Sequence, residues 1–188
     1  MYLNQVLGGS TSSRIFQEIR EKRGLAYSAH SFSDQYQDVG CFGVYVGTSP
    51  NNVKEVLHLV QEELYRTGNE GVSEEEFEVA RGHILGALAL SDEDTGSKMS
   101  RLARTYLVLG QALSLDEIAS RVRGVKRDEV NELAACLLAD SDPFVAVVGP
   151  FDEREARELV ADARISDLVY EEFQMPHSSE IIREHQLA

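Results

Sequence analysis

The hydrophobic and polar positions of this chain predict the end of a helix over residues 2–7, broken at Gly8-Gly9, and a second helical pattern near residue 15. Ile15, Phe16 and Ile19 recur at the spacing of one helix face, directly after a Gly-Gly-Ser-Thr-Ser-Ser run. A serine of that run is placed to cap the helix, and Gly24 follows its basic last turn as a C-terminal stop. The pattern therefore predicts a helix that ends near Gly24 and turns directly into a strand.

The alternating pattern that follows predicts an antiparallel hairpin. Over residues 26–32 the positions alternate as in a strand, with Tyr27 and Ala29 expected on the same face. Turn-forming residues separate this strand from a second one over residues 39–48. Three glycines in the second strand are expected to leave gaps in which another backbone or a large side chain can lie close.

Helical spacing returns in the rest of the chain. One helix is expected to end at Gly68, and the next begins at a Ser73–Glu76 capping box. Further helices are expected over residues 99–109, 114–122, 127–138 and 152–163. Residues 144–148 are almost wholly apolar, which predicts a central strand covered on both faces. Strands, then helices, then a returning strand predict an α+β fold, with an antiparallel sheet packed against several helices.

Composition narrows the functional classes. The chain has 188 residues, of which 43% are hydrophobic and 27% charged, as is typical of a soluble globular protein. Its net charge of −14 argues against nucleic acid, and no apolar run reaches the ~20 residues that span a bilayer. No signal peptide is recognised, so a cytoplasmic location is expected. Cys41 and Cys136 lack metal or redox spacing and are expected to be buried thiols.

The corner between the first helix and the first strand carries the most specific motif, REKRGLAY at residues 20–27. Together with VGCFGVYVGTSP, SEEEFEVARGHILGAL and FVAVVGP, it resembles the C-terminal domain of the insulinase/pitrilysin zinc peptidases, which include the mitochondrial processing peptidase. The resemblance covers residues 1–150, and residues 151–188 are expected to form a helix plus an acidic tail. It implies the LuxS- and processing-peptidase-like metallohydrolase fold, here lacking its first strand.

The resemblance also implies roles for Arg20 and Tyr27, which stand seven positions apart. In the family, such a pair reaches the zinc site of the other domain, where it holds the peptide substrate and helps to stabilise the oxyanion. The metal motif itself, His-x-x-Glu-His, is absent, because no two histidines of this chain are four residues apart. We therefore expect this chain alone to bind no zinc and to be inactive. The zinc ligands would lie on an N-terminal half or a partner subunit.

The same residues also have structural interpretations. Arg20 has no carboxylate three or four positions away, whereas Arg14 and Lys22 can each pair with Glu18. Arg20 is therefore expected to be available to a remote acceptor. Tyr27, taken alone, is an ordinary strand aromatic that packs on a core.

The Gly8–Thr11 loop offers another class of site, because backbone N–H groups before a helix can cradle an anion. It lacks the Gly-Lys-Ser/Thr ending of a phosphate-binding loop, so a turn with a helix cap is the favoured interpretation.

The sequence thus predicts the substrate-binding half of a zinc metalloendopeptidase that hydrolyses peptide bonds. The competing hypothesis is a non-catalytic subunit or scaffold of a processing-peptidase-like complex. A truncated enzyme and a separate subunit both remain open, as does a homo-oligomer. Neither nucleic acid nor a membrane is expected as a partner.

Overall fold

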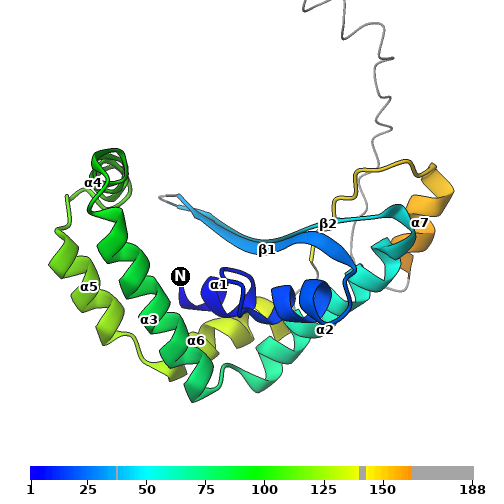
Figure 1. Ribbon diagram of the computed structural model, residues 1–188, viewed down its shortest axis with the longest axis horizontal. Helices are drawn as coiled ribbons and strands as arrows, with labels where there is room; N and C mark the ends of the chain where they lie inside the picture. Colours follow the sequence, from blue (N-terminus) through cyan, green and yellow to red (C-terminus); the bar gives the residue numbers. More distant parts are fainter. Residues whose placement is uncertain (37, 140–142, 162–188) are drawn as a thin grey trace, which may run out of the picture. The chain divides into compact units, whose positions relative to one another are not determined.

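The computed structural model describes residues 1–36, 38–139 and 143–161 (Figure 1). The chain divides into two compact units, Met1–Ser141 and Asp142–Ala188. The acidic tail expected at the C-terminal end lies, from residue 162 onward, outside the described residues. The division into domains at residue 150 stays a prediction.

The first unit contains the predicted corner and the hydrophobic core. Its elements in chain order are α1 (Tyr2–Leu7), η1 (Phe16–Glu21), β1 (Ala26–Gln35), β2 (Gly40–Thr48), η2 (Pro50–Asn52), α2 (Val53–Glu70), α3 (Glu74–Ser91), α4 (Thr95–Leu109), α5 (Leu115–Gly124), α6 (Arg127–Ala134) and η3 (Ala135–Ala139). In the second unit the described residues contain α7 (Glu153–Ala161).

The sheet of the described residues is the antiparallel β1–β2 hairpin. One face of the hairpin packs on α1, η1 and α2 (Figure 1). On that face Ala29 and Ser31 are buried, and their cross-strand partners Val46 and Val44 pack against the core. The predicted α+β class, an antiparallel sheet packed against several helices, is confirmed.

The end of α1 approaches β1 so closely that only glycine fits there. The Gly8 carbonyl accepts a hydrogen bond of 3.2 Å from the Ser31 amide, and a Cβ on Gly8 would overlap that same amide nitrogen. The Ser31 hydroxyl adds a bond of 3.0 Å to the Asn4 carbonyl. These contacts fix the loop over residues 8–13 against the strand.

Two helix starts follow their capping signals, and one helix end does not follow its glycine signal. Ser73 and Glu76 form the predicted reciprocal capping box at the start of α3, and Ser114 and Glu117 form another at α5. The stop predicted at Gly68 is wrong: Gly68 is buried inside α2, which ends at Gly71, where φ is +74°. Two nearby glycines give the same sequence signal, and the backbone conformation decides between them.

Three expectations about burial are wrong. Over residues 144–148 only Val145 makes a β-bridge, while Phe144 and Val148 are 65% and 82% exposed. An apolar run becomes a central strand only between two neighbouring strands. Cys41 and Cys136 are both exposed free thiols rather than buried ones. Burial depends on what packs over a residue, which local sequence does not specify.

No helix of the described part of the chain has the length and apolar character that a membrane crossing requires.

Candidate functional site

The corner that carries Arg20 and Tyr27 is built from a widened helical turn. η1 is a π-helix, in which the Lys22 amide donates to the Gln17 carbonyl five residues back, at 2.9 Å. Gly24 follows with φ +62°, and the space beside its Cα is empty, so backbone conformation rather than crowding explains the glycine. Single π-turns of this kind are frequent at functional sites. The predicted end of the helix at Gly24 is therefore confirmed.

The start of β1 is fixed by side chains from the other end of the hairpin. The Leu25 carbonyl accepts hydrogen bonds from Thr48 Oγ1 at 2.5 Å and from Asn52 Nδ2 at 3.4 Å. Ile19, on the inner side of η1, is fully buried. The segment between helix and strand is thus held at both ends.

A β-bulge turns Tyr27 outward. Ala26 pairs with Thr48 and Ser28 with Gly47, so Tyr27 is the extra residue of β1. Its side chain is 86% exposed, whereas Ala29 is 5% exposed. The expectation that these two residues share a face is wrong, because a bulge shifts the alternation of side chains. Neighbouring His30 and Tyr45 also lie on the outer face, with their ring centroids 5.1 Å apart.

Arg20 lies beside Tyr27 and stacks on aromatic rings. Its Cζ is 4.8 Å from the ring centroid of Phe16 and 5.3 Å from that of Tyr27. Both distances are in the range of cation–π attraction. Sequence reasoning missed Phe16 as a partner and assigned it only to the apolar stripe. The missed signal was the spacing of four residues between an aromatic residue and an arginine.

The other cations of this segment are occupied by carboxylates. Glu18 binds Lys22 at 2.8 Å and also pairs with Arg23. The hydrogen bonds from Lys22 and Arg23 lower the pKa of Glu18 to about 2. Among the residues that the structure describes, Arg20 has no carboxylate partner. The availability of Arg20 to a remote acceptor stays a prediction.

Arg14 does not pair with Glu18 as expected, but with Glu76, 62 residues away. Its guanidinium contacts the two carboxylate oxygens at 2.6 and 2.8 Å. It also donates to Thr67 Oγ1 at 2.9 Å and to the Gly71 carbonyl at 3.0 Å. Burial would raise the pKa of Glu76, but hydrogen bonds from Arg14 and Ser73 outweigh it and lower the pKa to about 2. This network ties the start of η1 to the α2–α3 turn.

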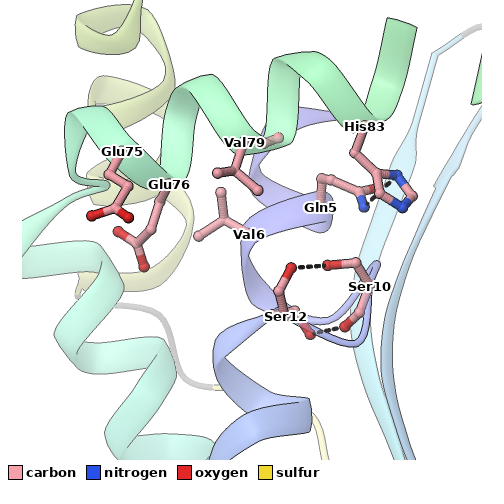
Figure 2. Close-up of a pocket in the computed structure, with 10 residues that line it drawn as sticks. Gln5, Val6, Ser10, Ser12, Glu75, Glu76, Val79 and His83 are labelled. Atoms are coloured by element: carbon pink, nitrogen blue, oxygen red, sulfur yellow. Dashed lines mark hydrogen bonds between the residues drawn. The ribbon is translucent and has the colours of Figure 1, made fainter. Parts of the chain in front are cut away.

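The Gly8–Thr11 loop does not form an anion site. The Gly8 and Gly9 amides already donate to the Asn4 carbonyl at 3.0 and 2.8 Å. The loop borders a cavity of about 210 Å³, which Glu75 and Glu76 also line (Figure 2). Carboxylates repel an anion. The loop is a turn, as expected. The expected serine cap is wrong, because η1 has no side-chain cap and the Ser13 hydroxyl donates to the Ser10 carbonyl instead.

The described residues do not fit a zinc ion. Nowhere among them do three or more His, Cys, Asp or Glu side chains gather in a way that could hold a metal. No chemical step is therefore assigned to a metal bound by this chain.

Comparisons with known proteins agree with this architecture. Residues 1–82 match the family model described as the peptidase M16 inactive domain. An uncharacterized zinc protease of Streptomyces coelicolor is 40% identical over 157 residues, which are 84% of this chain and 34% of the relative. An uncharacterized zinc protease of Bacillus subtilis is 40% identical over 148 residues, 79% of this chain and 36% of the relative. The chain thus spans about a third of the length of these relatives.

Solved structures show the same fold. A conserved protein from Enterococcus faecalis has a TM-score of 0.59 at 26% identity, covering 71% of this chain and 31% of that one. The inactive peptidase domain from Bordetella parapertussis has a TM-score of 0.62 at 21% identity and covers 74% of this chain and 75% of that one. At 21% identity, the Bordetella parapertussis domain supports a shared fold and no shared role. Residues 1–82 thus match the peptidase M16 inactive domain, and the chain is similar to about a third of the length of proteins named zinc proteases.

Proposed function

We propose that this chain is the substrate-binding half of a zinc-dependent peptidase, which supplies Arg20 and Tyr27 to a zinc site on an N-terminal half or a partner subunit. The supporting observation is that the Arg20 guanidinium, which has no carboxylate partner among the described residues, lies 5.3 Å from the ring of a phenol that is 86% exposed. Neither group is sealed within the packing of its own unit. Both can reach a substrate that approaches from outside.

The chemistry of the two side chains suits different parts of a peptide. Arg20 presents a planar set of N–H donors, which suits a substrate carbonyl or carboxylate. Tyr27 carries a hydroxyl that can donate a hydrogen bond to negative charge developing on the scissile carbonyl. Phe16 limits the conformations of Arg20, which reduces the entropy lost on binding. Zinc would supply an activated water when bound to the other half.

The test is a mutant series in the enzyme assembled with the half that carries His-x-x-Glu-His. We expect Arg20→Ala and Tyr27→Phe each to lower kcat/KM for a peptide substrate by about 10²-fold or more, with unchanged zinc content. Arg23→Ala is the matched control, because Arg23 lies on the same segment but pairs with Glu18. The chain alone should show no chelator-sensitive cleavage.

Unchanged kcat/KM in both variants would contradict the proposed roles. The chain would then act as the non-catalytic subunit or scaffold of the competing hypothesis. An in-frame His-x-x-Glu-His motif upstream in the gene would indicate a single enzyme, and a neighbouring gene encoding it would indicate paired subunits. A cytoplasmic location is part of the proposal, since the two cysteines are free thiols, as is typical of a reducing compartment.

A further inference from the structure

The cavity between α1, the loop over residues 8–13 and α3 has no part in the proposed peptidase site. It measures about 210 Å³, below the ~300–1,000 Å³ of sites for drug-sized ligands. A cavity of this size suits a single side chain or a small molecule. Its lining residues are Gln5, Val6, Ser10, Ser12, Ser13, Glu75, Glu76, Val79, Ala80 and His83.

The lining is divided along α3. Figure 2 shows Glu75 and Glu76 at one end, Gln5 and His83 at the other, and apolar side chains between them. Eight residues of helix separate Glu75 from His83, which corresponds to roughly 12 Å. A ligand along this line would meet a carboxylate first, then an apolar wall, then hydrogen-bonding groups.

One carboxylate at the acidic end is free. Glu74 pairs with Arg127 at 3.4 Å, and Glu76 is held by Arg14 at 2.6 Å. Glu75 is exposed, lines the cavity and has no cationic partner in the described part of the chain. Val6, Val79 and Ala80 then form a wall suited to an aliphatic stem.

The polar end supplies both donors and acceptors. The Gln5 amide lies 2.9 Å from His83 Nδ1 and also donates to the Gly9 carbonyl. Since an amide nitrogen donates, His83 Nδ1 is the acceptor in this contact. The Ser10 and Ser12 hydroxyls lie 3.1 Å apart beside it. This end can hydrogen-bond a polar group without requiring a charge.

We propose that this cavity binds an ammonium group on a short aliphatic stem, with the ammonium on Glu75 and the stem against Val79 and Val6. The acidic chain, with a net charge of −14, favours cations over anions at such a site. Two sources share this chemistry: a free alkylamine and the lysine side chain of a peptide. The inference does not depend on the peptidase proposal, because binding is measured on this chain alone.

The experiment titrates the full chain with n-butylammonium and, as a neutral match, with 1-butanol. Amide chemical shifts in ¹H–¹⁵N NMR spectra locate the binding. We expect saturable shifts at Glu75, Val79 and Val6 with the amine, and at least about tenfold weaker binding of the alcohol. Acetyl-lysine-methylamide and acetyl-norleucine-methylamide form the peptide arm. Binding of the lysine compound alone would identify a peptide as the source, and binding of the free amine alone a small molecule.

Two variants separate a built site from diffuse attraction. Glu75→Gln should weaken amine binding by about tenfold. Glu74→Gln removes the same charge one residue away and should leave binding unchanged, because Glu74 faces Arg127. Thermal unfolding checks that both variants fold. Absence of saturable shifts in the cavity with every amine, or equal weakening by both variants, would overturn the proposal.

Discussion

Two arginines six residues apart, Arg14 and Arg20, have opposite surroundings. Arg14 is bound to a carboxylate, a buried hydroxyl and a backbone carbonyl, all from the α2–α3 region. Arg20 rests on two aromatic rings and has no carboxylate partner among the described residues. The Arg14 guanidinium is hydrogen-bonded within the unit, whereas the Arg20 guanidinium has only stacking contacts among the described residues.

This difference between the two arginines indicates how the corner is fixed to the unit while the Arg20 and Tyr27 side chains lie beside each other between the fixed points. Arg14 fixes the start of η1 to the rest of the unit, while Gly24 and the Leu25 carbonyl fix its end. Arg20 and Tyr27 lie between these anchors and are held by stacking, which restrains direction without occupying N–H groups. Stability and proposed function are thus assigned to different arginines.

The largest expected effect is the loss of the Arg14 network. Arg14→Ala should lower the free energy of unfolding by about 3 kcal/mol, because it removes the cation from the partly buried Glu76 carboxylate and the donor from the buried Thr67 hydroxyl. Arg20→Ala should lower it by less than about 1 kcal/mol. Urea unfolding followed by circular dichroism measures both. Equal losses would contradict the division between the two arginines.

Acid should remove part of the same stabilisation. The pKa of Glu76 is about 2 in the folded chain, against 4.5 for an ordinary glutamate. A lowered folded pKa gives stability that is fully present above about pH 4.5 and lost as the pH falls towards 2. We expect roughly 2 kcal/mol of loss over this range from Glu76. The lowered pKa of Glu18 acts in the same direction.

Unfolding free energies at a series of pH values test this expectation. Glu76→Gln should flatten the acid slope, and Glu75→Gln, one residue away without an ion pair, should leave it unchanged. A slope that stays the same in Glu76→Gln would mean that the pair with Arg14 is not what the acid breaks.

The smallest effect concerns the stacking of Arg20. Phe16→Leu keeps an apolar side chain but removes the ring, and should cost less than about 1 kcal/mol. The Arg20 side chain should become more mobile, as measured by relaxation of its ¹⁵Nε signal. Phe32→Leu removes another ring of the unit and serves as the control. Equal Arg20 mobility in Phe16→Leu and the unaltered chain would show that stacking does not hold the guanidinium.

Local chemistry in the sequence determined the helix caps at Ser73 and Ser114, the turn at Gly24, the hairpin and the resemblance to the peptidase M16 inactive domain over residues 1–82. Each of these features depends on residues within a few positions of one another, or on a motif read as a whole. Arg20 has no carboxylate three or four positions away in the sequence, and in the described residues Glu18 pairs with Lys22 and Arg23 instead.

Only the tertiary structure decided which way Tyr27 faces and what Arg14 binds. The bulge at Tyr27 depends on the pairing register with β2, and the partner of Arg14 stands 62 residues away. Burial of Gly68 and exposure of Cys41 likewise depend on what packs nearby. Sequence spacing specifies which atoms are close along the chain, whereas register and long-range packing specify which atoms meet across it.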